Sequence, residues 1–217
     1  MSRKPILIVA GEPNSIFLEI FFKSIGKNYF KSPLIIIVSK KLLIKQMEIL
    51  GFNFKLNLIN ENYLHLNQLN NKKINIINVD YKFKKPFEKI SIRSNNYIAE
   101  CFGLALRMIN KNGFLNLING PISKKHFLKG KSLGITEYLA KKTKNNSNVA
   151  MLIYNKKLSV SPITTHLALK DVHRNISKQK IYTHIKLITE FYRKNLKKKP
   201  KIAITGLNPH CESNFKD

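Results

Sequence analysis

The chain has 217 residues, of which 43% are hydrophobic, a length and composition typical of a globular protein that buries a core. No stretch reaches the ~18 to 20 consecutive apolar residues of a membrane-spanning helix, and residues 1–10 run straight into a strand-like segment in place of a signal peptide. These features exclude an integral membrane protein and predict a cytoplasmic location.

The net charge is +27, from 39 Lys and Arg against 12 Asp and Glu. A balance this basic is typical of proteins that bind nucleic acid or anionic membranes. The lysines, however, are spread through nearly every segment, and no arginine-rich stripe or nucleic-acid motif accompanies them. Lys, Asn and Ile, all abundant here, are the residues that A+T-rich codons specify, so genome composition is the preferred explanation. We expect no specific nucleic-acid partner and no membrane partner.

Strand-like and helix-like segments alternate along the chain. Short apolar or alternating runs predict strands at residues 6–10, 34–38, 54–59, 74–79, 114–118, 149–154, 158–163 and 201–205. Apolar residues at helical spacing predict helices from about residue 16 and at 40–50, 95–112, 136–142 and 178–196. Asn14 or Ser15 is expected to cap the first helix, while Gly51 and Gly113 are expected to end the second and third. This alternation predicts an α/β sheet covered on both faces.

Two loops that follow expected strands combine glycine with proline. They are Gly11-Glu-Pro and Asn119-Gly-Pro-Ile-Ser-Lys124. Ligands bind at the carboxyl ends of the strands in open α/β sheets, so loop amides there can hold an anion or a phosphate, with Lys124 or Lys125 as the positive partner. The alternative is a pair of tight turns with no ligand. The three spaced glycines of the dinucleotide-binding fingerprint are absent.

Two histidines follow expected strands near the end of the chain. His166 comes after residues 158–163, and His210 after residues 201–205. Two imidazoles suit Zn, Co, Ni or Fe, but a catalytic zinc site takes three protein ligands, so a third would come from elsewhere in the chain, a partner subunit or residues not present here. Asp171 either orients His166 or caps the next helix, and capping is preferred.

Five segments together resemble the 4-hydroxythreonine-4-phosphate dehydrogenase family of vitamin B6 biosynthesis. In chain order they are Gly11-Glu-Pro, Asn119-Gly-Pro-Ile-Ser-Lys124, Gly134-Ile-Thr-Glu137, Thr164-Thr-His-Leu-Ala-Leu169 with Asp171, and Gly206-Leu-Asn-Pro-His210. The resemblance implies a two-lobed α/β fold like that of isocitrate and isopropylmalate dehydrogenases. Residues 1–217 would form the N-terminal and central part of that fold, which is expected to be incomplete at the C-terminus.

The resemblance also implies a reaction. It is the NAD-dependent oxidation of 4-phosphooxy-L-threonine, with decarboxylation to 3-amino-2-oxopropyl phosphate, in pyridoxal 5'-phosphate biosynthesis. A divalent cation (Zn, Mg or Co) would be held by three histidines, two of which map onto His166 and His210. Thr136 would contact the substrate, Lys124 would lie near its phosphate, and a homodimer would carry the site at its interface.

The chain departs from the family pattern at three places. Ile135 replaces the histidine of the family's Gly-His-Thr-Glu motif, which removes a polar substrate contact. Residues 126–132 are shorter than the family's loop, and the family continues beyond the Asn-Pro-His motif into a part that carries the third metal histidine and much of the NAD site. The alternative prediction is therefore a truncated, catalytically inactive remnant or paralogue that retains partial metal binding.

Overall fold

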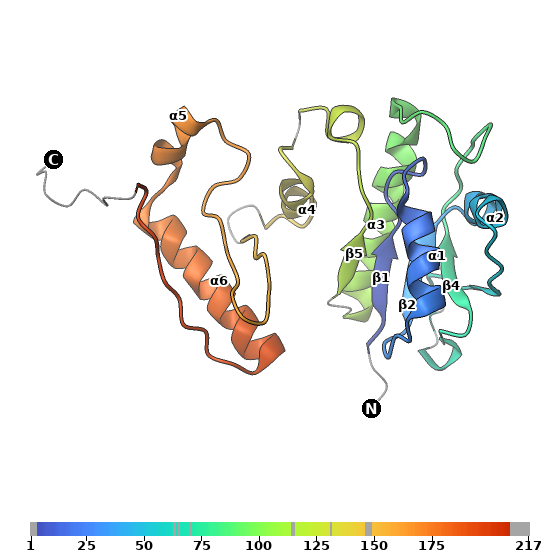
Figure 1. Ribbon diagram of the computed structural model, residues 1–217, viewed down its shortest axis with the longest axis horizontal. Coiled ribbons are helices and arrows are strands. Elements are labelled where there is room, and N and C mark those ends of the chain that lie inside the picture. Colours follow the sequence, from blue (N-terminus) through green and yellow to red (C-terminus); the bar gives the residue numbers. More distant parts are fainter. Residues whose placement is uncertain are drawn as a thin grey trace, which may run out of the picture. The chain divides into compact units, whose positions relative to one another are not determined.

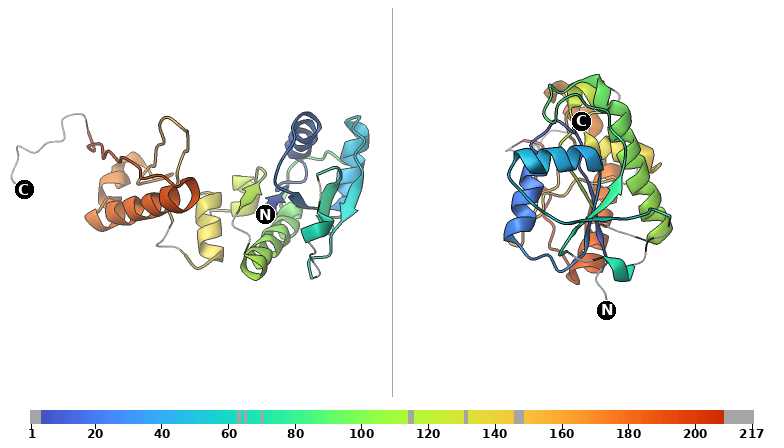
Figure 2. Two further views of the ribbon diagram at one scale, coloured as in Figure 1. Left: turned by 90° about the horizontal axis from the view of Figure 1, so that it is seen from below. Right: turned by 90° about the vertical axis from the view of Figure 1, so that its right-hand side faces the viewer.

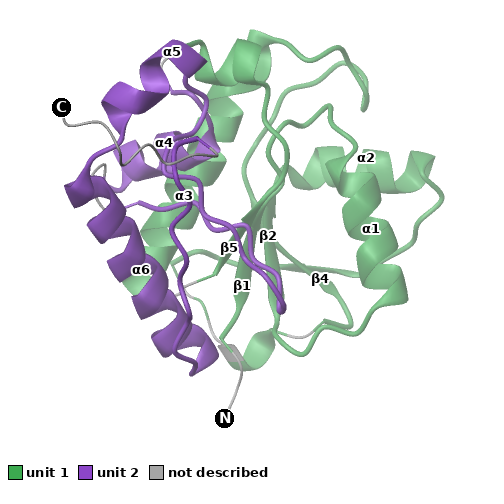
Figure 3. Ribbon diagram, turned by 60° about the vertical axis from the view of Figure 1, so that its left-hand side comes forward, with its two compact units in different colours: residues 1–131 green, residues 132–217 purple. Residues whose placement is uncertain are grey.

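The computed structural model describes residues 4–62, 64, 66–69, 71–113, 116–130, 132–145 and 149–208. The chain divides into two compact units, residues 1–131 and residues 132–217, which are described separately below (Figure 3).

Unit 1 is built on one parallel sheet. Its strands are β1 (Ile6–Val9), β2 (Leu34–Val38), β3 (Leu56–Leu58), β4 (Ile74–Asn78) and β5 (Leu117–Asn119). They lie in the order β3-β4-β2-β1-β5, and every neighbouring pair is parallel (Figure 1). Parallel pairing needs crossover connections, which three of the predicted helices supply. The sequence-based expectation of an α/β fold is confirmed in this unit.

Helices cover both faces of that sheet. They are α1 (Phe17–Lys27), α2 (Lys40–Ile49) and α3 (Asn95–Asn112). Figure 2 shows α1 and α2 on one face and α3 on the other. On the first face, Ile8, Ile36 and Ile76 of the strands pack with Phe22 of α1 in one buried cluster. On the other face α3 packs along β1 and β2 and buries the residues that define its apolar stripe, Ile98, Phe102 and Ala105 among them.

The helix ends follow the predicted signals closely. Gly51 and Gly113 both adopt left-handed backbone angles just past α2 and α3, as expected for glycine in that position. At the start of α1, the Ser15 hydroxyl accepts a hydrogen bond from the Phe17 amide at 3.3 Å. Asn14, the other predicted cap, instead accepts from the Glu88 amide. Shorter helical turns are η1 (Leu66–Gln68), η2 (Ile92–Ser94) and the π-helical η3 (Lys124–Leu128).

Unit 2 is mainly helical in its described part. It contains α4 (Ile135–Lys142), α5 (Leu169–Val172), η4 (His173–Asn175) and α6 (Lys178–Leu196). The helices predicted at 136–142 and 178–196 are therefore confirmed. No helix in the described ranges has both the length and the apolar character needed to traverse a lipid bilayer.

Three predicted strands of unit 2 are wrong. Residues 149–154 and 158–163 are joined only by an isolated antiparallel bridge between Ile153 and Val160, and residues 201–205 form no ladder. An apolar alternating segment becomes a strand only when a neighbouring strand pairs with its backbone. Within the described residues of unit 2 no such neighbour is present, and Leu158 keeps 74% of its surface exposed.

Candidate functional site

The two glycine loops meet at the carboxyl edge of the sheet in unit 1. The Glu12 amide donates to the Pro121 carbonyl at 2.8 Å, and the Gly120 amide donates to the Val9 carbonyl at 2.7 Å. A Cβ atom on Gly120 would lie 2.0 Å from the Ala10 carbonyl oxygen, so the backbones approach too closely for any other residue. Because both amides already have protein acceptors, the geometry favours the alternative of tight turns over an anion site.

A buried carboxylate lies beneath these loops. Glu12 is 3% exposed, and Ser94 donates its hydroxyl hydrogen bond to Glu12 Oε2 at 2.8 Å. Burial raises the pKa of Glu12 above its ordinary value of 4.5, while the bonds from Ser94 and from the Asn14 amide, with the charge of His126, act in the opposite direction. A negative group here opposes an anion at the same edge. Glu12 was quoted within the Gly11-Glu-Pro loop but given no role, although an acid directly after an apolar strand was a visible signal.

Lys124 and Thr136, both predicted to contact the substrate, belong to different units. Lys124 is the first residue of η3 in unit 1 and is exposed, and its carbonyl accepts from the Lys129 amide. Thr136 lies in the first turn of α4 in unit 2. Both roles stay predictions.

A cavity of about 360 Å³ opens beside the first turn of α4. Its polar lining brings together segments that the sequence analysis singled out separately. That lining includes Thr136, Glu137, Thr164, Thr165, Lys180 and His184. Three threonine hydroxyls, a carboxylate, an ammonium and an imidazole around one cavity can orient a small substrate that carries hydroxyl and charged groups.

His184 and Lys180 reach this cavity from α6, one helical turn apart, and were not predicted. His184 is 8% exposed, its Nδ1 has no hydrogen-bond partner among the described residues, and burial together with the charge of Lys180 lowers its pKa. Both effects favour the neutral form of the imidazole. Its only signal in the sequence was a histidine on the apolar side of a helical pattern, which is more often a core residue than a site residue.

His166 adopts an unusual backbone conformation. Four non-glycine residues in the described ranges have positive φ, and three of them, Lys129, Lys144 and Lys197, end helices, where the left-handed region is common. His166, at φ 55°, is outside any helix end. Left-handed backbone costs an L-residue roughly 1–2 kcal/mol, and such outliers cluster at functional sites. The side chain is exposed, and no described residue hydrogen bonds to its ring.

The predicted metal site is visible only in part. His210 lies outside the described residues, and within the described ones no group of three or more His, Cys, Asp or Glu side chains could hold a metal ion. His166 is the one predicted ligand whose position is known. Its exposed imidazole is a suitable donor for Zn or Co.

Asp171 does not cap the next helix as predicted. Ala168 is the residue at the N-cap of α5, and Asp171 lies in the first turn, where its amide donates to the Ala168 carbonyl. An acid there still interacts favourably with the helix dipole. The prediction of capping was wrong by three positions. Whether Asp171 orients His166 stays a prediction.

Comparison with known proteins identifies relatives over nearly the whole chain. The family described as pyridoxal phosphate biosynthetic protein PdxA matches residues 30–215. The 4-hydroxythreonine-4-phosphate dehydrogenase of Sulfurihydrogenibium sp. is 33% identical over 96% of this chain, and that of Aquifex aeolicus is 30% identical over 96%. The D-threonate 4-phosphate dehydrogenase of Salmonella typhimurium is 23% identical over 99%.

Solved structures resemble this fold as well. The crystal structure of 4-hydroxythreonine-4-phosphate dehydrogenase from Klebsiella pneumoniae matches 96% of this chain and 65% of its own, with a TM-score of 0.79 at 23% identity, a likeness that concerns the fold alone. The chain spans 64% of the length of the Sulfurihydrogenibium and Aquifex relatives.

Proposed function

The chain belongs to the family of pyridoxal phosphate biosynthetic protein PdxA, and we propose that it takes part in the NAD-dependent oxidation of 4-phosphooxy-L-threonine. The reaction would remove a hydride from the secondary alcohol, and the resulting 2-amino-3-oxo acid phosphate would lose carbon dioxide to give 3-amino-2-oxopropyl phosphate. The observation that carries the proposal is the meeting of Thr136, Thr164 and Thr165 at one polar cavity beside the turn that bears His166.

In this proposal the cavity of unit 2 receives the substrate. Thr136 donates or accepts through its hydroxyl, and Lys180 supplies positive charge within the same lining. Lys124 is retained as a second candidate for the phosphate contact. Ile135 follows Gly134 where the family has histidine, so one polar contact is replaced by an apolar one, and weaker substrate binding is expected.

His166 and His210 are proposed as ligands of a divalent cation, Zn, Mg or Co. The exposed His166 ring, which no described residue hydrogen bonds, fits such a role. The chemistry supplied by a bound cation is Lewis-acid polarisation of the substrate hydroxyl and of the carbonyl formed from it. We assign no residue of this chain to NAD. The two-lobed fold of the isocitrate dehydrogenase type and a homodimer with the site at its interface are proposed on resemblance alone.

Two substrates have to be compared, because the relatives carry two names. 4-Hydroxythreonine 4-phosphate and D-threonate 4-phosphate differ at C2, where the first has an amino group and the second a hydroxyl. The greater identity to the Sulfurihydrogenibium relative, 33% against 28% and 23% for two relatives named for D-threonate 4-phosphate, favours the amino substrate. The test is NADH formation by the purified full chain with each compound in the presence of Zn, Mg or Co. Turnover of D-threonate 4-phosphate alone would reassign the substrate.

The second candidate is an inactive protein that retains partial metal binding. It is favoured by Ile135, which stands where the family's Gly-His-Thr-Glu motif has histidine. Zinc binding to the full chain and to His166→Ala, together with the NADH assay, separates the two. Loss of zinc binding in the variant with turnover in the parent supports the enzyme, and the same loss without any turnover supports the remnant. Unchanged zinc binding in His166→Ala would remove His166 from the site in either case.

A further inference from the structure

The turn that carries His166 is tied to the start of α4 by one hydrogen bond. Thr165 donates from Oγ1 to Glu137 Oε1 at 2.9 Å, across 28 positions of sequence. Glu137 lies in the first turn of α4, so a helix fixes its backbone. A hydroxyl bonded to a carboxylate is a charge-assisted hydrogen bond and among the stronger ones. The bond therefore holds the residue that directly precedes His166.

The side chains of Glu137 and His166 both lie close to Gly134. A Cβ atom at this position would lie 2.9 Å from Glu137 Oε2 and 3.4 Å from His166 Nε2. Carboxylate and imidazole thus converge on space that only glycine leaves open. Glu137 Oε2 is buried and has no hydrogen-bond partner among the described residues. Burying an unpaired carboxylate oxygen is unfavourable, so this carboxylate lies beside the imidazole at a cost to stability.

We propose that Glu137 is a positioning residue for His166: through the Thr165 hydroxyl it maintains the left-handed turn that presents the imidazole to a divalent cation. The inference rests on the proposed role of His166 as a ligand. It explains why the strained φ of 55° persists at a residue that ends no helix. Groups that orient a metal ligand typically change metal affinity about 10- to 100-fold when removed.

The first test needs no metal. Solution NMR of the full chain measures φ at residue 166 from the coupling between its amide and Hα protons and from their intraresidue NOE. Positive φ is expected in the parent, in Glu137→Gln, which keeps an oxygen for Thr165, and in Thr165→Ser. It is expected to be lost in Glu137→Ala and in Thr165→Val. A positive φ that persists in Glu137→Ala overturns the proposal whether or not the protein binds metal.

The second test titrates the same variants with Co(II) and follows the visible absorption of the bound ion. Affinity should fall about 10- to 100-fold in Glu137→Ala and Thr165→Val and stay near the parent in Glu137→Gln and Thr165→Ser. If Glu137→Gln weakens binding as much as Glu137→Ala, the carboxylate acts through its charge and the positioning role is wrong. If the parent shows no His166-dependent Co(II) binding, the ligand assignment fails, and the NMR result alone decides the positioning role.

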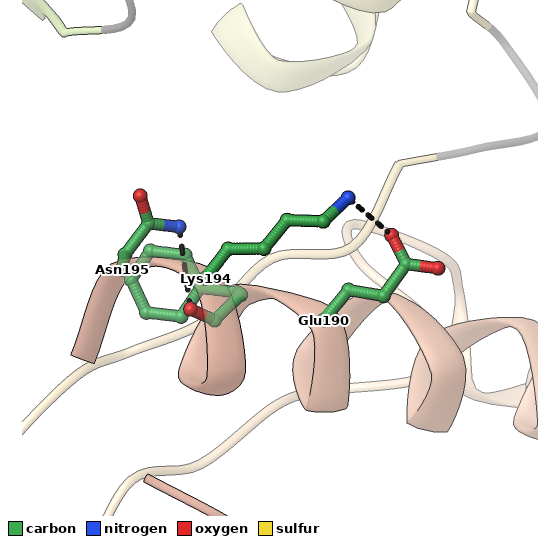
Figure 4. A network of polar contacts seen from close by, with 4 residues as sticks. Glu190, Lys194 and Asn195 are labelled. Carbon is green, nitrogen blue, oxygen red and sulfur yellow. Dashed lines mark hydrogen bonds and ion pairs between the residues drawn. The ribbon is translucent and has the colours of Figure 1, made fainter. Parts of the chain in front are cut away.

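A matched control comes from the same unit. Glu190 of α6 forms an exposed ion pair with Lys194, with 3.3 Å between Glu190 Oε2 and Lys194 Nζ, while the neighbouring Asn195 bonds the Phe191 carbonyl (Figure 4). Glu190→Ala removes a carboxylate without touching the turn at 164–166. Neither φ at residue 166 nor Co(II) affinity should change in this variant, and a change in either would show that both readouts respond to general loss of charge.

Discussion

The two units contain similar apolar patterns but bury them very differently. In the described ranges, every buried hydrophobic residue except Ala140 belongs to unit 1. Unit 2 leaves large apolar side chains exposed on all three segments that were predicted as strands, Leu158, Val160 and Ile204 among them. The same kind of apolar run thus becomes a core strand in one unit and an irregular segment in the other. What differs is the presence of a neighbouring strand to pair with, not the run itself.

The largest expected effect is loss of a core aromatic ring in unit 1. Phe22 is fully buried, and its ring packs against those of Phe52 and Phe54 with centroids 5.4 and 6.1 Å away. Phe22→Ala should lower the free energy of unfolding by about 3–5 kcal/mol, because a large cavity replaces the ring. Hydrogen exchange of the β1 and β2 amides, read by mass spectrometry, measures the loss.

The matched change in unit 2 is Phe191→Ala. Phe191 is 39% exposed and lies on α6. Its removal should lower the local stability of α6 by about 1 kcal/mol or less. Equal losses in the two units would mean that unit 2 has a buried core of its own, contrary to the comparison above.

The buried hydrogen bond between Ser94 and Glu12 is expected to make the next largest contribution to stability. Ser94→Ala removes the hydrogen bond to the Glu12 carboxylate and should cost unit 1 about 1.5–3 kcal/mol at pH 7. Burial raises the pKa of Glu12 in the folded state above its ordinary value of 4.5. Between these two pKa values the folded protein holds a proton that the unfolded chain has lost. The free energy of unfolding therefore falls as the pH rises through this window. Without Ser94 the pKa rises further.

The cost of Ser94→Ala should therefore be larger at pH 7 than below pH 4.5, where Glu12 is protonated in both states. Urea unfolding followed by circular dichroism across this pH range measures it. Ser91→Ala is the control, because the Ser91 hydroxyl accepts from the Arg93 amide, while the Ser91 carbonyl, which accepts from the Ser94 hydroxyl, is kept in the variant. The same pH dependence in Ser91→Ala would show that Glu12 is not the group responsible.

A substitution at His166 is expected to raise stability, whereas the preceding substitutions lower it. Glycine adopts positive φ without penalty, so His166→Gly should stabilise the turn by roughly 1 kcal/mol while removing the proposed ligand. Lys197→Gly provides the comparison, since Lys197 has φ 54° at the end of α6 and no proposed function. Thermal unfolding of both variants, with Co(II) titration, separates strain from function. If His166→Gly lowers stability, the imidazole contributes packing that exceeds the strain.

Local signals in the sequence predicted the helices well and the strands only where pairing partners existed. The helices at 95–112 and 178–196 have the predicted ends, because capping and helix-ending residues act within a few positions. The strands predicted at 149–154 and 158–163 were wrong, because strand formation depends on pairing with segments distant in sequence, which local signals do not report.

The residues of the candidate site show the same difference between local signals and long-range contacts. Thr136 and His166 were found by motif, and they lie beside the same first turn of α4. Glu137 was quoted within a motif but given no role, because its bond to Thr165 joins segments 28 positions apart. His184 gave no signal beyond its place on an apolar helix face. Long-range contacts of this kind depend on the fold, and a single sequence does not report them.

The smallest expected effect should be the same in both units. Glu190 pairs with Lys194 on α6, and Glu19 pairs with Lys23 on α1, in each case four positions apart and solvent-exposed. Removing either carboxylate should cost about 0.3–0.5 kcal/mol at low salt and less at high salt, because exposed pairs are screened. Hydrogen exchange of α6 in Glu190→Ala and of α1 in Glu19→Ala measures both. Equal small losses would mean that the two units differ in stability because of their buried apolar contacts. A much larger loss in α6 would instead show that surface charge stabilises unit 2, which lacks the buried core of unit 1.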